Sequence, residues 1–148
     1  MGAVRSQALT LRQCQVFPRY SARVTDGPAP DLVADVFARG CTSRAAFEDV
    51  TSKWASLVLL ALGEGTFRFN ALRRKVDGVS EKMLSQTLQA LERDGMLTRD
   101  VVTAIPPRVE YELTPLGAAV AERLRALADL LEASVPQVAA ARAEHAAR

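Results

Sequence analysis

Apolar residues recur at helical spacing in the stretch SEKMLSQTLQALERDG. Leu84, Leu88 and Leu91 form one stripe, so this stretch is predicted to be a helix with one face on a core. Ser80 is suited to cap its N-terminus, because a hydroxyl accepts a hydrogen bond from the first helical turn. Gly95 favours the left-handed conformation that ends a helix. The pattern therefore predicts a helix that begins at Ser80 and ends at Gly95.

Two helices are predicted near the start of the domain. Asp31 is suited to cap a short helix that ends at Gly40, and Ser43 is suited to cap a second helix that carries Val50. The short helix has four apolar residues that indicate docking against another surface, such as a second subunit: Leu32, Val33, Val36 and Phe37.

A helix-turn-helix pattern follows. Residues 53–62 are apolar nearly all round, which predicts a buried central helix that starts at Thr51 or Ser52. Asn70 is the expected cap of the next helix, and the turn at 77–79 has the length that joins two helices at a steep angle. The helix that begins at Ser80 comes directly after this turn.

Beyond Gly95, apolar and polar residues alternate, which is typical of strands. Residues 97–103 and 108–114 are predicted to be strands, and 104–107 a turn, since prolines are excluded from a central ladder. The aromatic segment 66–69 is suited to add a short third strand. Two strands joined by a proline tip directly after a helix-turn-helix form a wing. The predicted fold is mainly α with a small β-wing.

The C-terminal helix is predicted to begin at Thr114, with Pro115 in its first turn. Its apolar seam is longer than a small winged domain needs for its own core, and it includes Leu124, Leu127 and Leu131. An additional apolar face on a terminal helix indicates a partner helix, most simply from a second copy of the chain. Pro136 is expected to interrupt or end this helix.

This pattern predicts three regions in the chain. They are an N-terminal extension over 1–30, a winged helix-turn-helix domain with dimerisation helices over 31–133, and a C-terminal tail over 134–148.

Charge is distributed unevenly. The net charge is only +2, but residues 66–108 hold eight Lys and Arg against five acids, and residues 109–148 hold four Arg against six acids. A local excess of positive charge is typical of a nucleic-acid footprint.

The outer face of the helix after Ser80 spans an arc of about 100° and carries Lys82, Ser85, Gln86, Gln89 and Arg93. Such side chains suit base edges and phosphates in a major groove, although a solvated amphipathic helix is the alternative.

Composition argues against an enzyme, a cofactor or a metal site. The only histidine, His145, lies in the predicted tail, so neither a catalytic triad nor a histidine metal site is expected. Phosphate-loop and dinucleotide fingerprints are absent from the sequence. Two cysteines are too few for a disulfide scaffold, and we see neither a membrane span nor a signal peptide. We therefore expect a cytoplasmic protein.

Four segments resemble the HxlR-type winged helix-turn-helix regulators of bacteria, which are related to the MarR group. They are the opening Cys41, KWASLVLLAL at 53–62, FRFNALRRKVDGVSEKMLSQTLQALERDGML at 67–97 and PPRVEYELTPLG at 106–117. The resemblance covers about residues 41–131. It implies a homodimer that binds double-stranded DNA at an inverted-repeat operator near a promoter, with N- and C-terminal helices at the dimer interface.

The resemblance and the helix pattern together define the expected sites. The expected DNA contacts are Ser80, Lys82, Met83, Ser85, Gln86, Gln89, Arg93, Arg108, Arg73 and Arg74. The expected dimer contacts are Leu32, Val36, Phe37, Leu124, Leu127 and Leu131. Many relatives carry an arginine at the position of Thr87 and a basic residue at that of Gln89. Both are neutral here, so a lower phosphate affinity or a different operator is expected.

The regulating signal has two alternatives. Some relatives sense oxidants through the opening cysteine, and Cys41 precedes a predicted helix N-terminus, where amide dipoles favour the thiolate. Arg39 and Arg44 add positive charge nearby. A buried structural cysteine is the competing interpretation. A small molecule held between the dimer helices and the winged domain is the other candidate signal.

A winged helix that binds proteins rather than DNA is the competing function. Neutral Thr87 and Gln89 leave room for it. The two functions differ in salt dependence, because only DNA binding releases condensed counterions.

Overall fold

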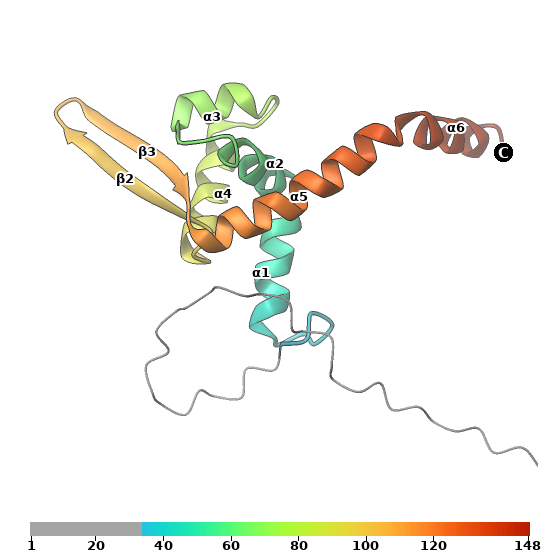
Figure 1. The fold of residues 1–148 in the computed structure, drawn as a ribbon, viewed down its shortest axis with the longest axis horizontal. Coiled ribbons are helices and arrows are strands. Elements are labelled where there is room, and N and C mark those ends of the chain that lie inside the picture. Colours follow the sequence, from blue (N-terminus) through green and yellow to red (C-terminus); the bar gives the residue numbers. More distant parts are fainter. Residues whose placement is uncertain (1–33) are drawn as a thin grey trace, which may run out of the picture. The chain divides into compact units, whose positions relative to one another are not determined.

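The computed structural model describes residues 34–148, apart from the side chains of Ala104 and Pro107. These residues are mostly helical, with one small antiparallel sheet in the strand order β1-β3-β2 (Figure 1). The elements are α1 (Thr42–Thr51), α2 (Lys53–Leu62), β1 (Phe67–Arg68), α3 (Phe69–Lys75), α4 (Glu81–Arg93), β2 (Leu97–Ala104), β3 (Pro107–Leu113), α5 (Pro115–Ala133) and α6 (Val135–Ala146). The predicted class, a mainly α fold with a β-wing, is confirmed.

The core is built around α2. Ala55, Val58, Leu59 and Leu62 are buried, and α2 contacts α1, α3, α4, α5 and β3. Ser52 is its N-cap residue, as predicted. This helix is therefore apolar on most of its sides because other elements pack against most of its sides. Leu57 is the exception, since 41% of its surface is exposed.

The central prediction for α4 is confirmed. The Ser80 hydroxyl accepts a hydrogen bond from the Met83 amide at 3.2 Å, which caps the helix. Gly95 has a φ of 71°, the left-handed conformation that favours glycine. Leu84, Leu88 and Leu91 are all buried. Both helix ends and the buried face thus follow from the local sequence.

The wing is the β2–β3 hairpin, which extends away from the helices (Figure 1). Phe67 of β1 pairs with Tyr111 of β3, so the aromatic segment does add a short third strand. Pro107 was expected in the turn but is the first residue of β3, opposite Ala104. A proline is tolerated there because the first residue of a strand lies at the end of the ladder.

A close backbone approach joins the wing to α5. Thr114 caps α5 by accepting a hydrogen bond from the Gly117 amide at 3.0 Å, and its hydroxyl donates to the Gly95 carbonyl at 2.6 Å. Gly117 packs against the backbone of Met96, and a Cβ there would lie 1.8 Å from the Met96 carbonyl oxygen. Only glycine fits this contact, which fixes the start of α5 against the end of α4.

The C-terminal region begins as the sequence predicts, with Thr114 as the N-cap residue of α5 and Pro115 in its first turn, but it contains a second helix. α5 packs on α2, with Ala121 buried and Val120 and Leu124 packed against the core. α5 ends at Ala133 and α6 begins at Val135, so the helical run is interrupted just before Pro136, as expected, and Pro136 lies in the first turn of α6. The region expected as a tail thus contains a helix, none of whose residues is buried.

Two predicted caps are wrong, and the described part of one predicted helix is not helical. Residues 36–40 form turns rather than a helix, because the Asp35 carboxylate accepts a hydrogen bond from the Phe37 amide at 2.9 Å and competes with helical bonding. The N-cap residue of α1 is Cys41, not Ser43. α3 begins at Phe69, with Arg68 rather than Asn70 as its N-cap residue.

Asp31, Leu32 and Val33 lie outside the described residues, and so does most of the predicted N-terminal extension. The division into three regions stays a prediction. Within residues 34–148, none of the helices combines the length and the apolar character needed to cross a membrane.

Candidate nucleic-acid interface

The helix-turn-helix consists of α3, a short turn and α4. Gly78 in this turn has a φ of 82°, which favours glycine, and the neighbouring Val79 is buried. Leu72 anchors α3 in the core, with none of its surface exposed. The two helices are therefore held by buried side chains, and α4 keeps one long face outside the core.

The outer face of α4 carries the polar side chains that the sequence predicted. Lys82, Gln86 and Gln89 are exposed, Ser85 is half-buried, and Met83 is 40% exposed. Lys82 makes no ion pair within residues 34–148. A long uncompensated cation beside amide side chains can contact both phosphates and base edges.

Thr87 lies on the opposite side of the helix. Its side chain faces the core, and only 9% of the residue surface is exposed. A neutral residue at this position therefore removes no charge from the outer face. The expected loss of phosphate affinity at Thr87 does not apply in this geometry, whereas Gln89 does lie on the exposed face.

Two other predicted contacts have partners within the protein. The Ser80 hydroxyl is already used as the cap of α4. Arg73 on α3 forms an ion pair with Glu81 in the first turn of α4. These residues fix the turn between the two helices, and their remaining capacity for DNA contacts is smaller than that of Lys82.

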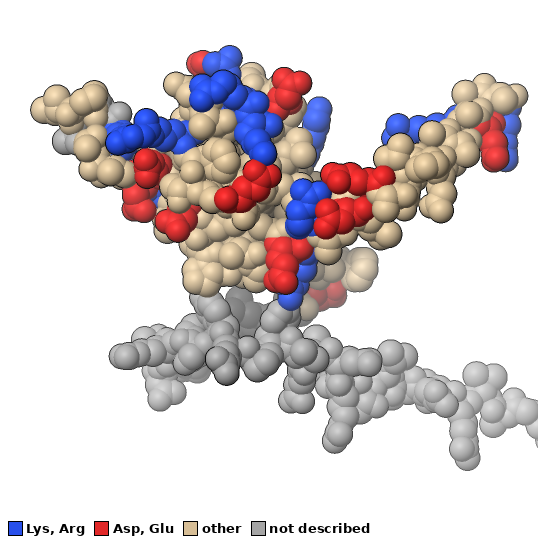
Figure 2. All heavy atoms as spheres, turned by 45° about the horizontal axis from the view of Figure 1, so that its top comes forward, with Lys and Arg blue, Asp and Glu red and all other residues tan. Residues whose placement is uncertain are grey.

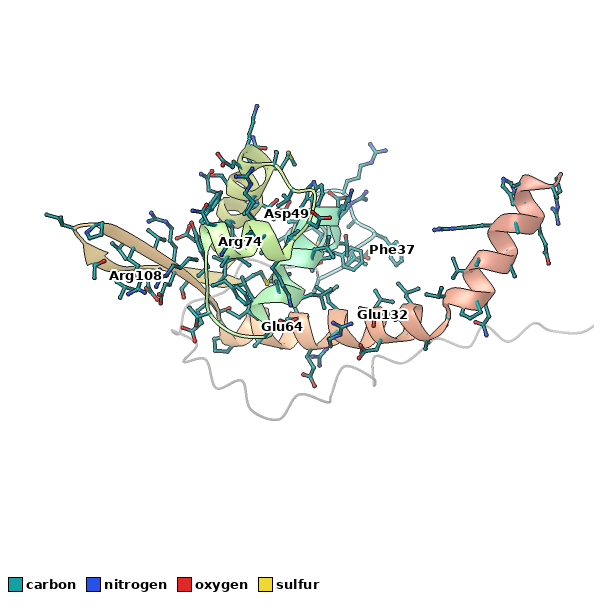
Figure 3. The ribbon with its side chains drawn as sticks, turned by 90° about the horizontal axis from the view of Figure 1, so that it is seen from above. Phe37, Asp49, Glu64, Arg74, Arg108 and Glu132 are labelled. Atoms are coloured by element: carbon teal, nitrogen blue, oxygen red, sulfur yellow. The ribbon has the colours of Figure 1, made fainter. Side chains whose placement is uncertain are left out.

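Arg74 is the exposed cation of α3 without an ion pair among the described residues. Figure 3 shows Arg74 on α3 and Arg108 on the wing. The Arg108 side chain lies 3.8 Å from a Glu110 oxygen, and Arg68 lies 3.5 Å from the same oxygen. Glu110 thus compensates part of the charge on the wing.

Arg99 is a cation that the sequence analysis did not single out. It lies on β2 opposite Tyr111, and it is exposed without an ion pair among the described residues. It lines a hollow of about 410 Å³ together with Ser85 and Gln89 of α4. Strand alternation in the sequence groups Arg99 with every second residue of β2, but its place beside α4 depends on the register and packing of the sheet.

Positive side chains gather in one region of the surface. Figure 2 shows Lys and Arg over α3 and continuing toward the wing, with acidic side chains mostly below them. This distribution agrees with the charge excess in residues 66–108. The outer face of α4, α3 and the base of the wing therefore form one candidate surface, which we call the basic face: Arg74, Lys82, Gln86, Gln89, Arg99 and Arg108.

Arg93 is engaged elsewhere. Although its position falls on the same arc of α4, its guanidinium donates to Asp49 of α1 at 2.6 Å and to Asp94 at 3.1 Å. Both carboxylates, Asp94 first, raise the pKa of Arg93. Its charge is already compensated, so we leave Arg93 out of the basic face.

Cys41 lies at the N-terminus of α1. Its sulfur is 3.0 Å from the Ser43 hydroxyl and accepts a hydrogen bond from the Asp35 amide at 3.3 Å. These hydrogen bonds, Ser43 first, lower the pKa of the thiol. Arg44 was expected to supply positive charge, but it pairs with Glu48 at 2.8 Å. The thiolate is thus favoured by hydrogen bonds at the helix N-terminus.

The predicted dimer contacts within the described residues are mostly uncovered. Phe37 is 88% exposed, and Leu127 and Leu131 on α5 are each more than half exposed. Val36 is 41% exposed, whereas Leu124 packs partly against the core. Leu130 and Val135 continue the exposed apolar surface toward α6.

Comparisons with known proteins agree with this geometry. The model of the HxlR-like helix-turn-helix family matches residues 49–139. The HTH-type transcriptional regulator YtfH of Escherichia coli strain K12 is 56% identical over 113 residues, which are 76% of this chain and 90% of that protein. A Methanothermobacter thermautotrophicus protein named as an HTH-type transcriptional regulator is 39% identical over 60% of this chain and 68% of its own.

Solved structures show the same fold. The structure of the regulator YtfH from Salmonella typhimurium has a TM-score of 0.68 at 55% identity, covering 73% of this chain and 96% of that one. The redox regulator HypR in its reduced form has a TM-score of 0.61 at 27% identity, covering 66% of this chain and 96% of its own. The chain belongs to the HxlR-like helix-turn-helix family, a family of transcriptional regulators and not of enzymes.

Proposed function

We propose that this protein regulates transcription by binding an inverted-repeat operator near a promoter as a homodimer. The observation that carries the proposal is the outer face of α4, where Lys82 has no ion pair among the described residues and Gln86 and Gln89 are exposed. A buried apolar stripe holds the helix in place, and the Ser80 cap defines where it begins. Such a helix fits the major groove of DNA.

Different residues of the basic face are expected to contact the bases and the phosphates. Gln86 and Gln89 suit adenine edges, which offer one donor and one acceptor to an amide. Lys82, Arg74 and Arg99 suit phosphates or guanines, and phosphate contacts set the register of the protein on the duplex. Arg108 on the wing extends this surface beyond α4. Each protomer is therefore expected to read one half-site.

A homodimer explains the uncovered apolar surface of α5. Leu127, Leu130 and Leu131 are too exposed to contribute to the core of one protomer. A second copy would cover them in a two-fold arrangement, in which the same surface of each protomer contacts the other. The two recognition helices would then lie about 34 Å apart, one turn of DNA.

The proposal is tested by selecting a preferred sequence from random duplex DNA and measuring its binding by fluorescence anisotropy across a salt series. For a dimer that neutralises about six phosphates, the logarithm of the association constant falls with the logarithm of the salt concentration with a slope near −5. We expect an inverted repeat to be selected. The absence of any selected sequence from a folded dimer would favour the protein-binding function instead, for which affinity is nearly independent of salt.

Oxidation of Cys41 is the regulating signal that the lowered pKa of its thiol favours. The lowered pKa of its thiol increases the fraction of thiolate, which is the form that attacks a peroxide oxygen. Two structural relatives are known in a reduced form: HypR, which is named as a redox regulator, and the transcriptional regulator YodB from Bacillus subtilis. We expect peroxide to change the DNA affinity of the wild type. If Cys41→Ser responds to peroxide and aldehyde as the wild type does, oxidation of this residue is not the signal.

A small-molecule effector stays the alternative signal. A hollow of about 500 Å³ lies where α2, β3 and α5 meet, and its apolar lining includes Leu62, Leu113 and Ala121. This is close to the space between the winged domain and the dimer helix that the sequence suggested. An effector would shift the DNA affinity only if it binds the two conformations of the dimer unequally.

A further inference from the structure

Three charged side chains join the end of α4 to α1. Arg93, the last residue of α4, donates from Nη2 to Asp49 Oδ2 at 2.6 Å and from Nε to Asp94 Oδ1 at 3.1 Å. Asp94 is the C-cap residue of α4, whereas Asp49 lies on α1, 44 residues before Arg93. We call these three residues the Arg93 cluster. Its guanidinium connects two elements that are distant in sequence.

The Arg93 cluster is poorly suited to stabilising the fold. The Asp94 side chain is 16% exposed, and its Oδ2 has no hydrogen-bond partner among the described residues. Lost solvation, followed by the Asp94 carboxylate, raises the pKa of Asp49, although Arg93 opposes this effect. A raised carboxyl pKa means that the charged form is less favourable in the folded than in the unfolded chain. Two adjacent carboxylates are therefore not fully offset by one guanidinium.

α1 lies between an uncovered apolar surface and the recognition helix. Val50 near its end is buried in the core, and the helix packs on α2 and α4. Phe47 of α1 is 56% exposed, and Phe37 in the preceding turn is 88% exposed (Figure 3). In the proposed dimer, a second subunit would contact these aromatic side chains. The Arg93 cluster is then the polar link between the dimer side of α1 and α4.

We propose that Arg93 is a positioning residue, which fixes the angle of the recognition helix against α1, and that it does not contact DNA. The inference rests on the proposed function, because the angle matters only when two linked recognition helices must fit one operator. Nε and Nη2 of Arg93 are bound to carboxylates, so only part of the guanidinium could reach a phosphate, although the side chain is 66% exposed. Substituting a residue that contacts a phosphate changes the salt dependence of DNA binding, whereas substituting a positioning residue does not. This difference separates the two roles.

The first experiment compares Arg93→Gln with Lys82→Gln on the operator selected by the wild type. A lost phosphate contact lowers the magnitude of the salt slope by about 1, which we expect for Lys82→Gln. For Arg93→Gln we expect affinity to fall by about tenfold, the effect of one mismatched base pair, with an unchanged slope. A slope that falls by about 1 for Arg93→Gln would make it a DNA contact and overturn the proposal.

The second experiment removes the partner on α1. Asp49→Asn eliminates a negative charge, which by itself should favour DNA binding, yet we expect weaker binding because α4 is no longer held. Since the folded pKa of Asp49 is raised, its stabilising contribution is greatest below its unfolded pKa and is lost as pH rises. Asp49→Asn should therefore not lower Tm at neutral pH. A residue with a merely structural role would lower Tm when removed.

Glu48→Gln is the matched control. Glu48 is the neighbouring residue on α1, and its ion pair with Arg44 stays within that helix. The operator is also prepared with one base pair inserted between its half-sites. An inserted base pair shifts and rotates one half-site relative to the other, which the geometry of the dimer opposes. We expect the wild type and Glu48→Gln to lose at least as much affinity as one mismatch costs, about tenfold, and Asp49→Asn to discriminate less between the two spacings.

The outcomes separate this inference from the proposed function. If Asp49→Asn keeps the affinity and spacing preference of the wild type, the positioning role is overturned while the regulator function stands. If the wild type selects no operator, the proposed function itself fails. Should Arg93→Gln fail to fold in a thermal melt, Asp49→Asn tests the same link from α1.

Discussion

At the scale of single residues, cations near α4 differ in whether a carboxylate already compensates them. Arg73 pairs with Glu81, and Arg93 pairs with Asp49 and Asp94. Arg99 has no ion pair among the described residues, although it lies close to Ser85 and Gln89 in the same hollow. The ion pairs therefore show which of these cations are available to bind DNA, and their positions in the sequence do not.

We predict that Arg99→Gln weakens DNA binding on all sequences, because a phosphate contact is lost without a base contact. The magnitude of the salt slope should fall by about 1. Anisotropy titrations at several salt concentrations measure both quantities. Arg142→Gln on α6 is the control, because it removes one exposed charge that has no ion pair among the described residues and lies far along the sequence. Equal slopes for the two variants would contradict this role of Arg99.

We predict that the Cys41 thiol reacts with iodoacetamide at lower pH than an ordinary cysteine does. The hydrogen bond from Ser43 is the main cause of the lowered pKa, so Ser43→Ala should shift the profile of alkylation rate to higher pH. The measurement uses a Cys14→Ser background, in which Cys41 is the only thiol. Identical profiles with and without Ser43→Ala would show that this hydrogen bond does not control the thiol.

At the scale of elements, sequence reasoning succeeded where the determining contacts are local. The Ser80 cap, the left-handed Gly95 and the leucine stripe define α4 within one stretch of chain. The caps predicted at Ser43 and Asn70 were wrong, because any of several neighbouring residues can take the N-cap position. The turn at Phe37 was missed because the Asp35 side chain competes with the helical backbone bond.

Contacts between distant elements were not predictable from the sequence. Nothing in the local pattern indicates that Arg93 meets Asp49, since 44 residues separate them. The position of Arg99 beside α4 depends on strand register and on how the sheet packs against α3 and α4. The candidate site was therefore predictable along α4, whereas the part contributed by the sheet required the fold.

We predict that Thr114→Ala lowers stability by about 1–2 kcal/mol, the usual effect of a lost N-cap. Its hydroxyl both caps α5 and donates to the Gly95 carbonyl at the end of α4, so two connections are lost together. Urea unfolding at constant pH measures the change. Thr114→Ser keeps the hydroxyl and should stay close to the wild type. A similar loss in both variants would assign the effect to the methyl group.

At the scale of the whole molecule, α5 connects the core of one protomer to the proposed second subunit. We predict that Leu127→Glu weakens self-association, because a charge replaces an apolar side chain that is 51% exposed in one protomer. Light scattering after gel filtration measures the mass in solution. Ala126→Glu, on a different side of the same helix, is the control. The Leu127→Glu variant should also lose affinity for the inverted repeat.

If the Leu127→Glu variant is still dimeric, the interface does not include this part of α5. A monomeric variant that still binds the inverted repeat as tightly as the wild type would contradict the dimer-based account of DNA binding. Either outcome leaves the core intact, because this side chain is more than half exposed in the protomer.

The edges of the sheet have a consequence for how the protein behaves in concentrated solution. β1 has only two residues, and the pairing of the edge strand β2 is broken by a bulge between Val101 and Thr103. Regular unpaired edges invite strands of other molecules, which is a common route to aggregation. The bulge disrupts the spacing that such pairing needs. β2 can therefore expose Val101 and Val102 to water while resisting the edge-to-edge stacking that begins fibrils.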